Sequence, residues 1–368
     1  MKKIGIIGAG HMGNGIAQKT AQEGLFVVMV DIKDEFVERG MNTIRSTLEE
    51  GVKRQILRPE QVEDIMGRIV GTTNLKDVAD CDLVIEAVFE DMGVKNELFA
   101  NLDKICEEKT ILATNTSTFS VDELSKSTNR ADRFVGLHFF YHPAKNRLLE
   151  IIPGSRTSTE TLKAAQKYSK LSGKIDLLAK DAPGFVVNRY FTSLNNEAFR
   201  ILEERIANIP TIDHAAKELL GVGMGPFLLV NVTGVPLALH TQAVLHERLG
   251  SFYKPAAILV KQVESGLDWP MEGDVEEIKV AAVGDRLMGS IFYNASSLLE
   301  EGVTDMLGVN IGAKVGLRWR KGPFELMNEV GIDRAYELVD KILKPYSDVK
   351  IPDVLTAQKT KGEPWGST

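Results

Sequence analysis

The sequence predicts an α/β domain followed by an all-α region, and three observations predict this order. An apolar strand at the N-terminus runs into a glycine-rich turn and then a helical pattern. Strand-like and helical segments alternate until about residue 178. Beyond that point strand signals nearly vanish, and long helical patterns recur at a fixed spacing. Alternation followed by an uninterrupted helical stretch is typical of two separate domains of different class.

The first strand-turn-helix segment indicates a phosphate-binding turn. The apolar run Ile4–Ile7 leads into Gly8, and Gly10 and Gly13 follow at the G-x-G-x-x-G spacing. In such a unit the first glycine makes the tight turn, the second lets the backbone approach a pyrophosphate, and the third lets helix and strand pack closely. We therefore predict a Rossmann-type dinucleotide site. Its residues in this segment are Gly8, Gly10, His11, Met12 and Gly13.

An acidic residue about twenty positions after the turn indicates which dinucleotide binds. The second strand, Phe26–Val30, is followed by Asp31. A carboxylate at this point accepts hydrogen bonds from a ribose diol and repels a 2′-phosphate. Ile32 comes next, with no arginine beside it, although Lys33 is close. The sequence therefore favours NAD over NADP as the cofactor.

The rest of the first domain, residues 1–182, alternates helices and strands. A helical hairpin over about residues 33–67 follows the second strand and is interrupted at Pro59. Further strands are expected at 69–70, 83–85, 110–113, 134–137, 148–152 and 174–178, and further helices at 74–79, 94–105 and 159–171.

The segment Asp181–Gly184 contains proline and glycine in a polar setting, which fits a domain boundary. The helical region beyond it contains an internal repeat, in which matching residues are 97 positions apart without a gap. We predict two copies of one helical unit, 183–275 and 280–368, joined near 270–284. The matching pairs include Arg189 and Arg286, Glu204 and Glu301, Phe227 and Phe324, Asn231 and Asn328, and Pro255 and Pro352.

Composition narrows the class of protein. The net charge of -7 over 368 residues argues against nucleic acid as a partner. Cys81 and Cys106 are too few for a disulfide framework, which suits a reducing compartment. The first strand begins almost at Met1, and no apolar run approaches the roughly 20 residues that span a bilayer. We expect a soluble cytoplasmic protein with no membrane partner and no metal.

A histidine and a glutamate form the candidate catalytic pair. His138 follows the predicted strand 134–137, and Glu150 lies in the next strand, 148–152. Two adjacent strands of one sheet would place both side chains at or near the same carboxyl-end edge. An imidazole beside a carboxylate is what a dehydrogenase needs to take a hydroxyl proton while hydride leaves the same carbon. A structural ion pair at a sheet edge fits the residue types equally well.

Several segments together resemble the 3-hydroxyacyl-CoA dehydrogenases of fatty-acid β-oxidation, and the resemblance covers essentially the whole chain. It implies NAD-dependent, reversible oxidation of an (S)-3-hydroxyacyl-CoA to the 3-ketoacyl-CoA, with a duplicated helical domain and no hydratase domain. The segments are Gly8–Ala17, Val84–Val88, Asn115–Ser117, His138–Phe140, Asp181–Arg189 and Met224–Phe227.

The resemblance implies four catalytic residues. His138 corresponds to the general base, Glu150 to its partner, and Ser117 to a donor toward the reacting oxygen of the substrate. Asn188, at the start of the helical region, corresponds to a second polarising contact. The alternatives are a turn or helix-cap serine for Ser117 and a helix-start asparagine for Asn188.

The resemblance also implies cofactor and substrate contacts. Glu90 and Lys95 correspond to residues at the ribose and nicotinamide end of the cofactor, where Asn115 and Ser117 are also expected. By residue type alone, Glu90 and Lys95 would pass for a solvated helix start. The hairpin corresponds to a flap over the CoA moiety, although such a charge run is more often just a solvated surface. Its candidate phosphate contacts are Lys53, Arg54 and Arg58.

Two departures from the family pattern stand out. Tyr141-His142-Pro143 replaces the usual Asn-Pro-Pro after His-Phe-Phe, which makes His142 a lesser acid/base candidate. The other departure is architectural, because single-activity members of the family commonly carry one helical unit and dimerise through it, whereas this chain carries two. The second helical copy has Asp285 where the first has Asn188, so we expect that copy to be structural. Because the duplication would replace a dimer contact internally, a monomer or a homodimer is expected.

Two other functions stay open at this point. One is a dehydrogenase of a free hydroxy acid, similar to the gulonate or carnitine dehydrogenases, which share the cofactor half and the histidine–glutamate pair. The other is a non-catalytic NAD-binding relative, against which the intact set of Ser117, His138, Glu150 and Asn188 argues.

Overall fold

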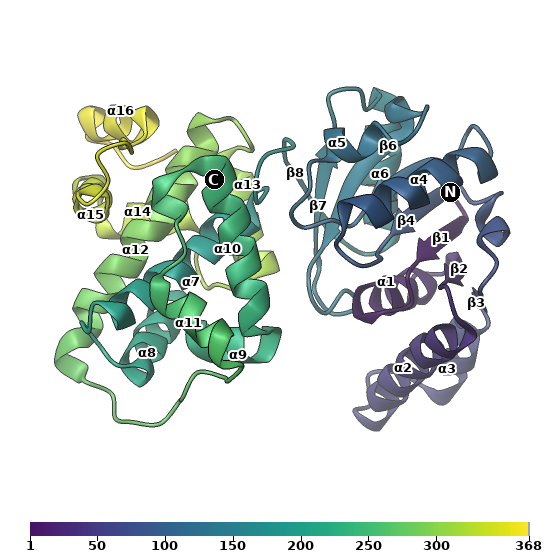
Figure 1. Cartoon of the computed structure of the whole chain (residues 1–368), viewed down its shortest axis with the longest axis horizontal. Coiled ribbons are helices and arrows are strands. Elements are labelled where there is room, and N and C mark those ends of the chain that lie inside the picture. Colours follow the sequence, from purple (N-terminus) through teal and green to yellow (C-terminus); the bar gives the residue numbers. More distant parts are fainter. Residues whose placement is uncertain (367–368) are drawn as a thin grey trace. The chain divides into compact units, whose positions relative to one another are not determined.

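A computed structural model describes residues 1–366 (Figure 1). The chain divides into two compact units, Met1–Asp181 and the part that begins at Ala182. The first unit is a sheet covered by helices on both faces, and the second is helical throughout. The α/β Rossmann-type domain and the all-α region expected from the sequence are confirmed.

The sheet of the first unit has eight strands in the order β3-β2-β1-β4-β5-β6-β7-β8. All neighbouring strands are parallel except β6 and β7, which are antiparallel. The chain builds outward from β1 first through β2 and β3 and then returns to add β4 on the other side. Doubly wound sheets bind dinucleotides at the carboxyl ends of the strands at this reversal. The strands are β1 Lys3–Ile7, β2 Phe26–Val30, β3 Ile69–Thr72, β4 Leu83–Glu86, β5 Ile111–Thr114, β6 Phe134–Phe139, β7 Leu148–Pro153 and β8 Ile175–Leu178.

Helices connect these strands, and the predicted hairpin is present as α2 and α3, which lie side by side (Figure 1). The short helices α5 and η2 had no clear pattern in the sequence, because each is at most five residues long. The elements are α1 His11–Gln22, α2 Asp34–Lys53, α3 Pro59–Met66, η1 Leu75–Val78, α4 Met92–Ile105, α5 Val121–Ser125, η2 Ala131–Arg133 and α6 Thr159–Leu171.

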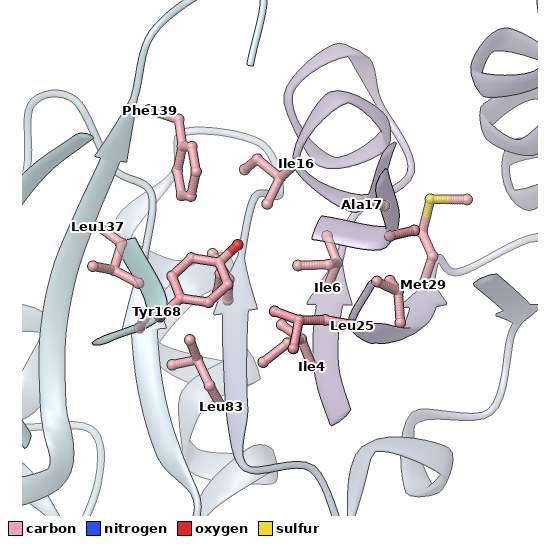
Figure 2. Packing of buried hydrophobic residues seen from close by; sticks show 14 of the residues in the cluster. Ile4, Ile6, Ile16, Ala17, Leu25, Met29, Leu83, Leu137, Phe139 and Tyr168 are labelled. Carbon is pink, nitrogen blue, oxygen red and sulfur yellow. The ribbon is translucent and has the colours of Figure 1, made fainter. Parts of the chain in front are cut away.

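The main apolar core of this unit lies between the sheet and helices α1 and α6. Figure 2 shows Ile16 of α1 and Tyr168 of α6 facing the side chains of Ile6 and Leu137. The Tyr168 hydroxyl is 2.8 Å from Thr20 Oγ1 of α1, so this buried polar group has a partner. Helices cover both faces of the sheet, so residues pointing to either face are buried. This explains why the strands are continuous apolar runs in the sequence rather than alternating ones.

The second unit contains two copies of a helical arrangement, with the 97-residue offset kept in three dimensions. Helix α9 and helix α14 begin and end at equivalent residues, Pro226–Thr233 and Pro323–Val330. The N–H of Phe227 donates to Asp213 Oδ1 at 2.8 Å, and the N–H of Phe324 donates to Asn310 Oδ1 at 3.0 Å. The other elements are α7 Val187–Glu203, α8 Ile209–Leu220, α10 Val235–Leu249, η3 Ser251–Tyr253, α11 Ala257–Ser265, α12 Glu277–Glu300, α13 Met306–Ile311, η4 Gly312–Gly316, α15 Ile332–Leu343 and α16 Asp353–Lys361.

One boundary inside the repeat differs from the expectation. Helix α12 begins at Glu277, within the segment 270–284 that the sequence predicted as a connection. The helix has an extra N-terminal extension relative to α7, and Lys279 pairs with Glu276 there. Polar and apolar residues alternate without a helical period in the segment before the second copy. The hydrophobic pattern therefore did not predict that α12 begins as early as Glu277.

The two copies exchange equivalent ion pairs. Arg189 of the first copy donates to Glu301 of the second at 2.9 and 3.0 Å. Arg286 of the second copy donates to Glu204 of the first at 2.7 and 3.3 Å. Arg286 is the repeat equivalent of Arg189, and Glu301 is that of Glu204. A contact in which residue i meets j and j meets i is the signature of a two-fold related interface.

Removing one partner from this exchange is expected to have unequal effects. Glu301→Ala leaves the guanidinium of Arg189, which is 0% exposed, without its carboxylate, and we expect a loss of about 2 kcal/mol in unfolding free energy. Glu204→Ala is the matched control, because Arg286 keeps its second partner, Glu197. Urea unfolding of both variants measures the difference. Equal losses in the two variants would contradict the argument from burial.

No single helix among residues 1–366 is long and apolar enough to cross a membrane. One bent pair, α9 and α10, passes the length and composition test jointly, with an angle of 104° between its helices. Exposed apolar side chains on α9, Leu228 and Val232, have Glu325 and Glu329 at the equivalent positions of α14. The second copy folds with glutamates at these two positions, so the exposed apolar side chains of α9 are not needed for the fold of the helical unit.

Candidate active site

His138 and Glu150 form a buried pair across two neighbouring strands. They face each other directly in the register of β6 and β7, and His138 Nδ1 is 2.6 Å from Glu150 Oε2. His138 is 5% exposed and Glu150 is 0% exposed. The expectation that both approach from strands with a common carboxyl-end edge is wrong in one respect. Since β7 runs antiparallel to β6, Glu150 comes from the amino-terminal half of its strand.

The contact with Glu150 sets which nitrogen of His138 carries a proton. A carboxylate only accepts hydrogen bonds, so we infer that the shared hydrogen sits on Nδ1. In the neutral ring, Nε2 then carries the lone pair. The ring of Phe140 lies 4.5 Å from the His138 ring, centroid to centroid, and is tilted by 55° to it. An imidazole with this tautomer can take a proton at Nε2, and this role of His138 stays a prediction.

The glycine-rich turn forms a cradle that only glycine allows. Gly8 has φ +106°, a conformation that side chains rarely adopt. A Cβ at Gly13 would lie 1.8 Å from the carbonyl oxygen of Gly8, because helix and turn are in close contact there. A Cβ at Gly10 would meet nothing within 4 Å, so this face of the turn is open. The tight turn at Gly8 and the close packing at Gly13 agree with the sequence prediction, whereas the approach of a pyrophosphate at Gly10 stays a prediction.

The beginning of α1 suits a pyrophosphate. No side chain caps this helix, and its first turn contains no acidic residue, so its first N–H groups suit an anion. His11 is exposed and Met12 half-buried in that turn. Asp31 accepts hydrogen bonds from the N–H of Ala9 and of Ile32, both at 2.7 Å. Each carboxylate oxygen keeps a lone pair for a ribose hydroxyl, so these residues fit NAD.

A cluster of three charged side chains lies where β4 ends. Lys95, 1% exposed, contacts Glu86 Oε1 at 2.6 Å and Glu90 Oε2 at 2.9 Å. The alternative of a solvated helix start is therefore wrong for Lys95. Burial alone would raise the pKa of Glu90, but Lys95 and the hydroxyls of Thr116 and Thr118 outweigh it and lower that pKa.

Glu86 is a site residue that the sequence analysis did not single out, although it lies in the matching segment 84–88. It is 0% exposed and accepts hydrogen bonds from the N–H of Val88 at 2.8 Å and from Thr114 Oγ1 at 2.7 Å, besides the contact with Lys95. A carboxylate at the end of an otherwise apolar strand was the available signal. Buried acids of this kind are rare unless they are paired.

Glu90 ties the cluster to the loop that carries Ser117. Its Oε1 accepts from the N–H of Ser117 at 3.2 Å and from Thr118 Oγ1 at 2.8 Å, and Thr116 Oγ1 donates to it as well. The side chain of Asn115 accepts from the N–H of Phe139 at 2.9 Å, which joins this loop to the strand of His138. The structure therefore brings together Glu90, Lys95, Asn115 and Ser117 in one unit with the histidine pair.

The two alternatives for serine and asparagine come out differently. The cap of α5 is Ser120, whose side chain accepts from the N–H of Glu123, so Ser117 is not a helix cap, whereas the alternative of a turn serine stays open. Asn188 is the second residue of α7, in the second unit, and is half-buried. Its helix-start position matches the plainer reading, and its catalytic role stays a prediction.

The tip of the hairpin places the three candidate CoA contacts on an exposed turn. Arg54 pairs with Glu50 on α2, whereas Lys53 and Arg58 flank the turn. Ile56 lies between them and is 72% exposed. Two exposed cations around an exposed apolar side chain suit a surface that meets a phosphate and an adenine ring.

The loop between β6 and β7, which contains Tyr141 and His142, is held by a buried lysine. Lys174 donates to the carbonyl oxygens of Pro143 and Asn146. Burial, with a smaller contribution from Lys19, lowers the pKa of Lys174 to about 7. The pKa of His142 is also lowered, by burial first and then by Lys145 and His11. An imidazole that resists protonation suits His142 poorly as an acid at neutral pH.

Lys174→Met is expected to change how stability depends on pH. The unfolded chain holds the lysine proton up to about pH 10.5 and the folded protein only to about 7, so stability of the unmodified protein rises with pH between these values. Between pH 7 and 9 we expect its unfolding free energy to gain about 2 kcal/mol relative to the variant. Urea titrations at the two pH values measure this. A constant difference between the proteins would contradict the lowered pKa.

Comparisons with known proteins agree with this geometry. Residues 3–182 match the family model for the 3-hydroxyacyl-CoA dehydrogenase NAD-binding domain. Residues 184–268 and 283–363 both match the model for the C-terminal domain of that family. A probable 3-hydroxybutyryl-CoA dehydrogenase of Deinococcus radiodurans is 40% identical over 72% of this chain and 95% of its own length. A 3-hydroxybutyryl-CoA dehydrogenase of Bradyrhizobium diazoefficiens is 38% identical over 72% and 91%.

Solved structures give the same result. The (S)-3-hydroxybutyryl-CoA dehydrogenase of Ralstonia eutropha is 38% identical, with a TM-score of 0.70 over 72% of this chain and 94% of the other. A 3-hydroxybutyryl-CoA dehydrogenase of Escherichia coli covers 98% of both chains with a TM-score of 0.90 at 22% identity, a likeness of fold. The arrangement of one α/β unit and two helical copies thus has a solved counterpart over its full length.

Proposed function

Since the chain belongs to the 3-hydroxyacyl-CoA dehydrogenase family, we propose that it oxidises an (S)-3-hydroxyacyl-CoA to the 3-ketoacyl-CoA, reversibly and with NAD. The observation that carries the proposal is the buried His138–Glu150 pair in the same unit as the glycine cradle and Asp31. When bound, NAD supplies the hydride acceptor. Relatives named for a four-carbon substrate support a short acyl chain.

The protein side of the mechanism centres on one proton. His138 Nε2 accepts the proton of the substrate hydroxyl, while the carboxylate of Glu150 holds Nδ1–H and stabilises the resulting imidazolium. Because Glu150 is fully buried, its charge acts at close range with little screening by solvent. In the reverse direction the same nitrogen returns the proton to the carbonyl oxygen.

Two further side chains complete the proposed site. The hydroxyl of Ser117 donates to the reacting oxygen of the substrate, from a loop held by Glu90 and Asn115. Asn188 provides a second polar contact from α7. Lys53, Arg54 and Arg58 bind the phosphates of CoA at the hairpin tip. These residue roles, like the expected domain bounds 1–182, 183–275 and 280–368, stay proposals.

The reciprocal ion pairs of the helical unit support a monomer, because the two copies already meet each other as two subunits would. A homodimer is the second possibility. A cytoplasmic location and the lack of nucleic-acid and membrane partners stay predictions from composition.

Oxidation of NADH with acetoacetyl-CoA tests the proposed function. We expect rapid turnover of the thioester and little of free acetoacetate, because the exposed cations of the hairpin have phosphates to bind only in the thioester. Lys53→Ala/Arg58→Ala, at side chains that the structure places at the tip, is expected to raise KM for the thioester and leave kcat nearly unchanged.

Turnover of the free acid alone would instead indicate a hydroxy-acid dehydrogenase. Binding of NADH without turnover of either substrate would indicate a non-catalytic relative. The intact geometry of the His138–Glu150 pair speaks against the latter.

A further inference from the structure

The cluster of Glu86, Lys95 and Glu90 has an unbalanced charge. Two carboxylates share one ammonium group, which leaves one formal negative charge. Glu86 and Lys95 are 0% and 1% exposed and the Glu90 side chain is 27% exposed, so solvent and salt screen the charge of Glu86 poorly and that of Glu90 in part. The other contacts of Glu86, from Val88 N–H and Thr114 Oγ1, are dipoles that stabilise the charge without cancelling it.

The topology of the sheet places this excess charge on one side of the dinucleotide site. Asp31, the ribose-binding residue, follows β2, on one side of the reversal between β1 and β4. Glu86 is the last residue of β4 and pairs in register with Thr114, the last residue of β5, on the other side. A dinucleotide lies across such a reversal with its two halves on opposite sides. The cluster therefore belongs to the nicotinamide half, next to the Ser117 loop.

We propose that Glu86 raises the affinity of the site for the oxidised cofactor relative to the reduced one. The nicotinamide ring is cationic in NAD+ and neutral in NADH, whereas the remaining charges of the cofactor are the same in both. A fixed buried negative charge on that side of the reversal attracts the oxidised ring and has no comparable effect on the reduced one. Glu86 thus acts through charge, without touching the reacting atoms, and sets the ratio of the two affinities.

A purely structural role gives a different expectation. If Glu86 only holds Lys95 and the end of β4 in place, its replacement disturbs the site for both cofactor forms alike. Charge selectivity, by contrast, changes the affinity for NAD+ more than that for NADH. The ratio of the two dissociation constants distinguishes a structural role from charge selectivity. A change in either dissociation constant alone does not distinguish them.

Glu86→Gln removes the charge and keeps the shape of the side chain. We expect the ratio of Kd for NAD+ to Kd for NADH to rise about threefold to tenfold, with calorimetry for NAD+ and fluorescence titration for NADH. Thr114→Val is the matched control, because it removes the hydroxyl that donates to Glu86 Oε2 and changes no charge. Its ratio is expected to stay within twofold of the unmodified protein. Asp31→Asn, at the adenosine half, is expected to weaken both forms equally.

An equal change in both dissociation constants of Glu86→Gln, or a fall in their ratio, would overturn the inference. If that variant does not fold, Glu90→Gln makes the same charge change at a less buried position. The inference then requires the same rise in the ratio of Kd for NAD+ to Kd for NADH in the Glu90 variant. The inference rests on the NAD site of the proposed function but not on the thioester substrate. Failure of acetoacetyl-CoA turnover therefore leaves it standing, whereas failure of the unmodified protein to bind either cofactor form overturns both.

Discussion

Replacement of His138 by alanine is expected to lower kcat for acetoacetyl-CoA reduction by about 10²–10⁴-fold, because no other group then transfers the proton at the reacting oxygen. The KM for NADH is expected to change little, since His138 lies outside the glycine cradle and contacts Glu150 instead. Steady-state kinetics at saturating NADH measures the effect.

Glu150→Gln provides the second half of this test. A glutamine amide can donate to Nδ1, which favours the tautomer with hydrogen on Nε2, and that nitrogen then no longer accepts a proton. In the oxidation of 3-hydroxybutyryl-CoA by NAD+, where Nε2 must accept the substrate proton, we expect a loss of kcat comparable to that of the alanine variant, with the strand pairing of β6 and β7 intact. Circular dichroism and NADH titration control for folding. Retention of more than about a tenth of the activity in either variant would exclude the proposed proton transfer.

Two glycine substitutions are expected to separate folding from cofactor binding. Gly13→Ala places a Cβ 1.8 Å from the backbone oxygen of Gly8, where neither side can give way, and should cost about 3 kcal/mol or more of unfolding free energy. Gly10→Ala adds a methyl group that meets nothing in the protein. We expect its melting temperature to be unchanged but its affinity for NADH to fall at least about tenfold, because the methyl group occupies the space that the phosphates approach.

Thermal unfolding and NADH fluorescence titration of both variants check this pair. Gly223→Ala, at another open glycine that lies in the second unit and has no positive φ, controls for the substitution itself. Tight NADH binding by Gly10→Ala would contradict the assignment of the open face to the pyrophosphate.

Much of the first unit was predictable because its determinants are local. The turn glycines, the apolar strands and Asp31 follow one another within the first 31 residues, and each has a backbone or charge requirement that only a few residue types meet. The helical repeat was predictable because a constant offset between matching residues can be detected in the sequence alone, without any information about the fold. The domain class followed from these two facts alone.

The candidate site was predictable only in part. His138 and Glu150 were expected to be near each other, yet their direct pairing depends on β7 running antiparallel to β6, and strand direction is not encoded in a short apolar run. Likewise Lys95 and Glu90 had the composition of a solvated helix start. Their contacts with Glu86 and with the Ser117 loop join the end of β4 to two different connections of the sheet, β4–β5 and β5–β6.

The sequence by itself determined the fold class, the phosphate-binding turn, the preference for NAD, the histidine–glutamate candidates and the duplication of the helical unit. Only the tertiary structure decided that Glu150 faces His138 across an antiparallel pair, that Lys95 is buried between two carboxylates, that Lys174 holds the loop of His142, and that the helical copies exchange their ion pairs. The physical reason is that burial and charge pairing depend on which distant segments meet. Residue type and spacing describe a side chain's chemistry, whereas its neighbours decide whether that chemistry is solvated, paired or available to a substrate.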